Sequence, residues 1–328
     1  MHRRRSRHQV TRRQGAGQGV PGGYRGAHPV TALDRVRAEL AFAGCDGWCY
    51  AERIDRPGTG LGLGQDVPVV VASMYKLHLM VAACRAAAAG ALDLTQRVVI
   101  TPTEHTPGPT GFALFADDVE VSVRDLVRMM ITVSDNTSAE AVQHLLPVGA
   151  LDETLTALNL GDTVIRGGVG DQQRLTVSEL GAQDWQDAAH LLATDPATDQ
   201  VHAYDPAYVS HSTPRALCQL MRAIWTDTAS DPRQCAFMRE VLGQQIWPHR
   251  IASGFPTSST AVAGKTGTIG RIRAETAVVQ PDGEPPVVVC VVTRAARADA
   301  VLPVVDASIG RIARILVNEA RTDAEQLR

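Results

Sequence analysis

The chain lacks any apolar run long enough to span a membrane. No stretch of about 18 apolar residues occurs in its 328 residues, which excludes a transmembrane helix on sequence grounds. The start of the chain also lacks the apolar stretch of a secretory signal, because the arginines of residues 3–13 are followed by the Gly/Gln-rich residues 14–19. We therefore expect a cytoplasmic protein without a signal peptide.

Patterns that bind metals, nucleotides or phosphates are missing as well. The six cysteines are scattered and contain no C-x-x-C pair, so we expect neither a metal site nor a cofactor. The glycine-rich run 58–64 lacks the spacing of a dinucleotide-binding loop and is better explained as a hairpin connection. Residues 263–266 resemble the end of a phosphate-binding loop, but Ser259 stands where that loop needs glycine. No G-x-S-x-G motif is present, which disfavours an α/β-hydrolase.

Acidic residues are absent from residues 1–25, which hold seven arginines. The net charge of the whole chain is −3, so the rest of the chain carries −10. We expect residues 1–28 to form a disordered basic arm. A second interpretation is a peripheral contact of this arm with the anionic inner leaflet of the cell membrane. Because only the arm is basic and no recognition helix is visible, we expect no direct binding to nucleic acid.

The spacing of apolar residues predicts helices in the middle of the chain and strands toward both ends. Helices are expected at residues 31–43, 73–89, 122–132, 138–146, 151–158, 216–225, 235–242 and 300–317. Strands are expected at residues 47–54, 260–268, 274–280 and 286–294. The last three are joined by short turns and should be antiparallel. Both ends of the chain would then share one α/β layer.

Three short motifs follow one another along the chain. They are Ser73-x-x-Lys76 at a helix start, Ser134-Asp135-Asn136 after a helix, and Lys265-Thr266-Gly267 in a strand. Separately, such motifs are more often a helix cap, a turn and a strand end. Together, in this order, they predict a serine nucleophile with amine and hydroxyl partners. Residues i and i+3 of a helix share a face, so a buried, neutral Lys76 could accept the proton of Ser73.

The remaining motif residues have distinct expected roles. Ser134 can relay a proton to a leaving nitrogen, and Asn136 can hold a substrate amide together with Lys76. Lys265 would attract a substrate carboxylate, and the backbone N–H groups of Ser73 and Thr268 would form an oxyanion hole. We therefore predict catalytic roles for Ser73, Lys76 and Ser134, and substrate binding by Asn136, Lys265, Thr266, Gly267 and Thr268.

From about residue 31 to residue 320 the chain resembles class A β-lactamases and related penicillin-recognising serine enzymes. The resemblance rests on the three motifs, on residues 262–268 and 277–279, and on residues 212–217. It implies a five-stranded antiparallel sheet flanked by helices, plus an all-helical domain with the site between them. Residues 29–70 and 215–328 would form the α/β domain, and residues 71–214 the helical domain with an extended Ω-like loop at 166–213. Arg273 falls where many members have an arginine that binds the substrate carboxylate.

The resemblance is weakest where the family activates the water that releases the acyl group. Counting from Gly161-Asp162, the position of the family's glutamate falls on Asp171, and the asparagine of the E-x-x-L-N segment is missing. Aspartate is one methylene shorter, and proton transfer depends on close placement. The connection from Asp171 to Pro214 is also longer than in the family by roughly two dozen residues, a length at which loops are commonly functional or disordered.

Two functions follow from this pattern. The first is an intracellular penicillin-recognising protein that is acylated but poorly deacylated and acts as a sensor or regulator of β-lactamase expression. The resemblance extends to signal-less actinomycete proteins that work with a transcriptional regulator, and the ligand would be a β-lactam or a peptidoglycan-derived small molecule. The alternative is an active serine β-lactamase that uses Asp171, or a related serine amidase, esterase or acyltransferase. A peptidase acting on cell-wall crosslinks is disfavoured by the expected location.

Overall fold

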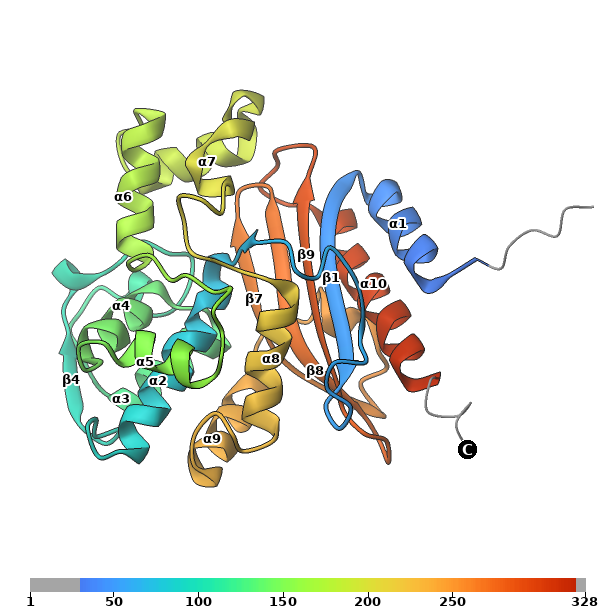
Figure 1. Ribbon diagram of the computed structural model, residues 1–328. Coiled ribbons are helices and arrows are strands. Elements are labelled where there is room, and N and C mark those ends of the chain that lie inside the picture. Colours follow the sequence, from blue (N-terminus) through green and yellow to red (C-terminus); the bar gives the residue numbers. More distant parts are fainter. Residues whose placement is uncertain (1–29, 323–328) are drawn as a thin grey trace, which may run out of the picture. The chain divides into compact units, whose positions relative to one another are not determined.

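The computed structural model describes residues 30–322. At its centre is a five-stranded antiparallel sheet with the strand order β2-β1-β9-β8-β7 (Figure 1). Its strands are β1 (Cys45–Arg53), β2 (Leu61–Leu63), β7 (Thr260–Ile269), β8 (Ile272–Pro281) and β9 (Val287–Ala295). Strand β1 lies beside β9, so the two ends of the chain meet in one sheet. The predicted fold class is confirmed.

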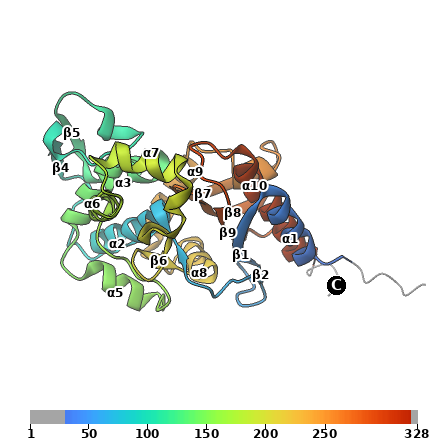
Figure 2. The ribbon, with the colours of Figure 1, turned by 90° about the horizontal axis from the view of Figure 1, so that it is seen from above.

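Helices cover both faces of this sheet. Helices α1 (Ala32–Ala43) and α10 (Pro303–Thr322) pack on one face, and α8 (Pro214–Trp225) packs on the other (Figures 1 and 2). Strands β8 and β9 are buried along almost their whole length, as expected for strands with helices on both sides. Thr31 begins α1 with a capping box, in which its hydroxyl accepts from the backbone N–H of Asp34.

The second part of the fold is helical and surrounds one central helix. Helix α2 (Lys76–Ala88) is buried on nearly all sides and contacts α3 (Val123–Thr132), α4 (Asn136–Leu145), α5 (Ala150–Ala157) and α9 (Pro232–Gly243). Two small antiparallel pairs complete the fold: β3 (Val69–Val70) with β6 (His211–Ser212), and β4 (Arg97–Ile100) with β5 (Val119–Ser122). The predicted helices along this part of the chain are confirmed within a few residues at each end.

Segment 166–213 differs from the extended loop that we expected. It contains α6 (Val169–Leu180), α7 (Trp185–Thr194) and two 3-10 turns. Asp184 caps α7 by accepting from the backbone N–H of Asp187. The extra length is therefore folded into helices and not left as an open loop.

Some predictions have no test in this structure. The disordered arm, its membrane contact and the lack of a signal peptide concern residues outside those described. The domain boundaries at residues 70 and 214 also remain predictions. Among the helices of residues 30–322, none combines the length and the apolar character needed to cross a membrane.

Candidate active site

Ser73 lies in a strained turn at the entry of the central helix. Ala72, directly before it, has a φ of +43°, a conformation that residues other than glycine rarely adopt. Such strain costs about 1–3 kcal/mol and is concentrated at functional sites. Both Ala72 and Ser73 belong to the 3-10 turn Ala72–Tyr75, which leads into α2. Between Val69 and Cys84, a stretch that the structure describes completely, every residue except Ser73 is buried. The turn thus presents this one hydroxyl side chain.

Lys76, one turn after Ser73, is completely buried with its amine held by the second motif. The Nζ donates to the carbonyl oxygen of Ser134 (2.6 Å) and to Oδ1 of Asn136 (2.8 Å). It also lies 3.5 Å from the hydroxyl of Ser134. Burial lowers the pKa of Lys76 to about 7, although the charges of Asp135 and Glu140 act in the opposite direction. A substantial fraction of Lys76 is therefore neutral near pH 7 and able to accept a proton.

The second motif is fixed by its own hydrogen bonds. Ser134 has a φ of +62°, and Asp135 caps α4 by accepting from the backbone N–H groups of Thr137 and Ser138. The Nδ2 of Asn136 donates to the carbonyl of Pro107 (2.7 Å). This bond fixes the orientation of the amide group, so that its oxygen, Oδ1, faces Lys76.

Strand β7 brings the third motif against the turn that holds Ser73. A Cβ atom at Gly267 would lie 2.7 Å from the carbonyl oxygen of Val71, so only glycine allows this approach. Lys265 is fully buried; burial, together with the charges of Lys76 and Arg250, holds its pKa well below the usual value for lysine. The side chain of Gln245 fixes the strand by accepting from the N–H of Thr266 (2.7 Å). The three motifs therefore meet at one place.

Arg250 is a part of this site that the sequence did not predict. Its Nη2 donates to the hydroxyl of Thr268 (2.7 Å), and its Nη1 donates to the carbonyl of Gly267 (2.9 Å). Its Nε is 2.7 Å from the carboxylate of Asp306. The residue lies at the end of an irregular connection before a short 3-10 turn, where no periodic pattern singles it out. Its positive charge is one of the causes that lower the pKa of Lys265.

Arg273, the arginine expected to bind the substrate carboxylate, is buried and bonded to backbone carbonyls. It is 4% exposed, and its guanidinium donates to the backbone carbonyls of Ile272, Gly270, Asp299 and Ala300. These bonds occupy its four terminal N–H donors. Arg273 is the cross-strand partner of Thr268 in the β7–β8 ladder, which explains why the sequence pointed to it. Arg250 is equally buried (3% exposed) and also donates to the carbonyl of Ala274 (2.9 Å). Unlike Arg273, however, it contacts a motif side chain, the hydroxyl of Thr268, which makes it the better candidate for binding a carboxylate.

The carboxylate of Asp171 is bonded within its own segment, to Gly168 and Arg174. Asp171 is the third residue of α6, where one carboxylate oxygen accepts from the backbone N–H of Gly168 (2.9 Å) and the other pairs with Arg174. Its side chain is 51% exposed. The predicted role of Asp171 as a base is therefore not supported by this geometry.

A different carboxylate, Glu140, acts on Lys76. Glu140 follows Asn136 by one helical turn on α4, so the two share a face. Its Oε1 accepts from the backbone N–H of Gly170 (2.9 Å), and its charge raises the pKa of Lys76. The i, i+4 spacing from Asn136 was the sequence signal that could have identified it.

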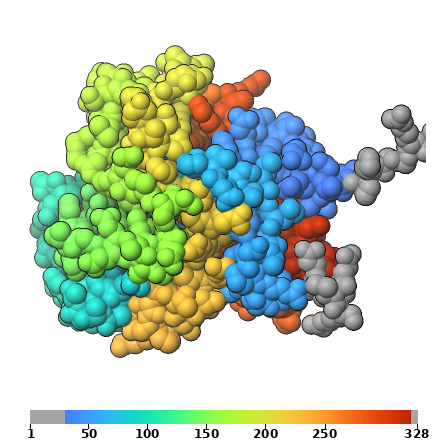
Figure 3. Space-filling model, viewed as in Figure 1, coloured from blue at the N-terminus to red at the C-terminus, as the bar shows by residue number. Residues whose placement is uncertain are grey.

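The long segment after α6 is fastened to the end of the sheet beside this site. The N–H of Arg271 donates to the hydroxyl of Tyr204 (3.2 Å), and its guanidinium donates to the carbonyl of Pro196 (3.1 Å). Arg294 donates to the carbonyl of Asp199. In the space-filling view this segment (yellow-green to yellow) lies against the strands of the sheet (orange) (Figure 3). It therefore borders the β7–β8 turn three residues beyond Thr268.

Comparison with known proteins identifies a family and a fold for this chain. The family model described as "Beta-lactamase enzyme family" matches residues 29–320. A relative from Streptomyces cacaoi, named beta-lactamase regulatory protein BlaB, is 28% identical over 285 residues, covering 80% of this chain and 89% of that protein. A β-lactamase structure from Sphaerobacter thermophilus is similar with a TM-score of 0.71 at 20% identity, covering 88% of this chain and 96% of the other. A mutant of PBP-A, solved as an acyl-enzyme complex with penicillin G, has a TM-score of 0.69 at 17% identity, with coverages of 89% and 96%.

Proposed function

The chain belongs to the beta-lactamase enzyme family, and from this premise we propose that it is a penicillin-recognising serine protein whose Ser73 is acylated but slowly deacylated. In this proposal the long-lived acyl form is a signal, and the protein senses β-lactams or peptidoglycan-derived molecules to regulate β-lactamase expression. The observation that carries the proposal is the position of Asp171, whose carboxylate binds Gly168 and Arg174 of its own segment.

Acylation is supported by the groups around Ser73. Lys76, with a pKa of about 7, can take the proton of the attacking hydroxyl, and Ser134 can pass a proton to the leaving nitrogen. The charges of Lys265 and Arg250 suit a ligand that carries a carboxylate. A β-lactam and a peptide from peptidoglycan both carry one, so either chemistry fits the site.

Slow deacylation follows from what the site does not supply. Hydrolysis of the acyl group needs a base that can hold a water beside the ester carbon. The two carboxylates of this region each accept a backbone N–H, Asp171 from Gly168 and Glu140 from Gly170, and Asp171 also holds Arg174. Both carboxylates thus hold in place the backbone segment that, in other members of the family, positions the hydrolytic water.

A regulatory role is supported by the name of the relative from Streptomyces cacaoi, a beta-lactamase regulatory protein. We extend that role to this chain as part of the proposal, with a transcriptional regulator as the partner that reads the acylation state. The alternative is an active serine β-lactamase, or a related amidase, esterase or acyltransferase. The observation that favours it is Glu140, a carboxylate close enough to Lys76 to raise its pKa.

One experiment separates the two. The purified protein is mixed with a chromogenic cephalosporin while colour change and intact mass are followed together, using Ser73→Ala as the test variant. The matched control is Ser178→Ala, which removes an exposed serine of α6. A single colour burst with a stable mass adduct, absent only in Ser73→Ala, supports the sensor. Sustained turnover supports the enzyme, and neither colour nor adduct contradicts both.

A further inference from the structure

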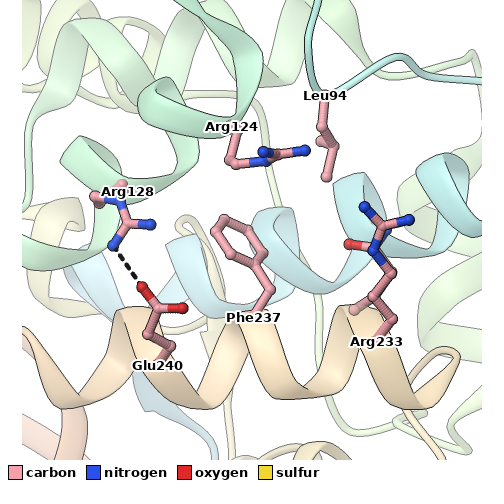
Figure 4. Close-up of a pocket in the computed structure, with 7 residues that line it drawn as sticks. Leu94, Arg124, Arg128, Arg233, Phe237 and Glu240 are labelled. Carbon is pink, nitrogen blue, oxygen red and sulfur yellow. Dashed lines mark hydrogen bonds and ion pairs between the residues drawn. The ribbon is translucent and has the colours of Figure 1, made fainter.

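A small basic cavity lies between α3 and α9. Its volume is about 250 Å³, and it is lined mainly by Arg124, Arg128, Arg233, Phe237 and Glu240 (Figure 4). Arg124 is the second residue of α3, and Arg233 is the second residue of α9. The cavity thus lies toward the starts of two helices that come from distant parts of the sequence.

The lining carries an excess of positive charge. Arg128 pairs with Glu240 (3.0 Å) and also donates to Gln244. Within residues 30–322, Arg124 and Arg233 take part in none of the ion pairs that the structure contains. The pKa of Asp93 is lowered mainly by hydrogen bonds that its carboxylate accepts from the hydroxyl and N–H of Thr95, and to a smaller extent by the charge of Arg124. The lining therefore holds three arginines and one glutamate, of which Arg233 and Glu240 are exposed to solvent.

The centre of the cavity is aromatic. Figure 4 shows the ring of Phe237 standing between the side chains of Arg124, Arg128 and Arg233. The guanidinium of Arg128 lies over this ring, 5.8 Å from its centroid. A ligand that fits these groups combines an oxyanion, for the guanidinium forks, with a flat apolar ring, for the face of Phe237. Guanidinium groups bind both carboxylate and phosphate with two parallel hydrogen bonds. Phosphate, which carries close to two negative charges near pH 7, matches the excess of arginine better.

We propose that this cavity is a binding site for a small phosphate monoester that carries a planar ring. Arg124 and Arg233 contact the phosphate, and Phe237 contacts the ring. The volume of about 250 Å³ is below the range of roughly 300–1,000 Å³ for drug-sized ligands, so the ligand is small. The proposal concerns a site separate from Ser73, and its binding test does not depend on the function proposed above.

The two helices connect this cavity to the motif residues. Helix α3 ends at Thr132, two residues before Ser134, and α9 ends at Gly243, two residues before Gln245, whose side chain holds the N–H of Thr266. The far ends of the helices are joined by a hydrogen bond from the N–H of Ile246 to the carbonyl of Thr132 (3.1 Å). A ligand that bridges the starts of both helices therefore favours one relative position of the second and third motifs. Occupancy of the cavity should therefore change the acylation rate of Ser73.

Calorimetric titration of the whole protein with phenyl phosphate and with inorganic phosphate tests the binding site. Arg124→Gln and Arg233→Gln should each weaken the affinity for both ligands by about tenfold or more, since a lost charge-assisted hydrogen bond contributes about 1.5–3 kcal/mol. Arg35→Gln, which changes an exposed arginine of α1, is the matched control and should bind as the wild type does. Phe237→Leu should reduce the preference for phenyl phosphate over phosphate.

Three outcomes would overturn the proposal. They are no binding of either phosphate at about 10 mM, equal affinity in the wild type and both arginine variants, and a Phe237→Leu protein that keeps the full preference for the ring. Binding that persists in both arginine variants would place the phosphate elsewhere, for example near Lys265 and Arg250. For the coupling, phenyl phosphate should change the rate of adduct formation at Ser73 in the wild type and leave it unchanged in Arg124→Gln. An unchanged rate in the wild type would overturn the coupling.

Discussion

Replacing Lys76 with methionine tests whether this buried lysine is neutral near physiological pH. Methionine has a similar length, carries no charge and fits an apolar core. The pKa of an unperturbed lysine, as in the unfolded chain, is 10.5, and the pKa of Lys76 in the folded protein is about 7. Between these two pH values the unfolded chain binds a proton that the folded protein does not, so stability increases with pH across this window.

The size of the effect follows from the difference between the two pKa values. At 1.36 kcal/mol per pH unit, the folded protein below pH 7 is about 5 kcal/mol less stable than at the high-pH limit because of Lys76 alone. Between pH 7 and pH 9.5, the free energy of unfolding of the wild type should increase by about 3 kcal/mol relative to that of Lys76→Met. The variant also leaves the carbonyl of Ser134 and Oδ1 of Asn136 without their donor, which adds an offset of about 1–3 kcal/mol that does not vary with pH.

The assay is urea unfolding followed by circular dichroism for both proteins at several pH values. Other titrating groups are common to the two proteins, so the difference between their unfolding free energies isolates Lys76. A difference that rises with pH between 7 and 9.5 supports a neutral Lys76. A difference that stays constant would refute the reasoning, because Lys76 would then hold its proton throughout this range and could not accept one from Ser73 at pH 7.

Three further variants test the surroundings of Ser73. Gly267→Ala should slow acylation by at least about tenfold while the fold persists, because the added Cβ would meet the carbonyl of Val71 at 2.7 Å; stopped-flow acylation and circular dichroism check this, and normal acylation would argue against the close approach. Glu140→Gln removes a charge that raises the pKa of Lys76, so the pH at which acylation becomes half-maximal should fall; an unchanged pH profile would mean that Glu140 does not act on Lys76. Arg250→Gln should weaken the binding of carboxylate-bearing β-lactams more than it slows acylation at saturating ligand. Measuring the acylation rate as a function of ligand concentration separates the binding constant from the maximal rate. A loss confined to the maximal rate would contradict a role in carboxylate binding.

The sheet could be predicted because its strands are bounded by clear signals. Strands β7, β8 and β9 are long runs rich in valine and threonine, and the turn near Gly283 separates the last two. Helix α6 could not be predicted in the same way. Its buried residues are Gln173 and Thr176, so its inward face carries no apolar period to detect.

The motif residues could be predicted from spacing, but their surroundings could not. Ser73 and Lys76 stand three residues apart, with Ser73 in the 3-10 turn that leads into α2 and Lys76 at the first position of α2. Their proximity follows from this spacing in the sequence. Arg250 reaches Thr268 from an irregular connection, a contact set only by tertiary packing. Asp171 was predicted by counting along the chain, and counting cannot reveal that its carboxylate turns toward Arg174.

The lifetime of the acyl group on Ser73 tests the central claim most directly. The protein is acylated with benzylpenicillin, excess ligand is removed quickly, and the adduct is followed by intact mass. Our account predicts release at least roughly a thousandfold slower than the turnover of about 10 s⁻¹ that is typical of enzymes. Release at an ordinary enzymatic rate would show that the site completes hydrolysis without Asp171 and would contradict the proposed sensor.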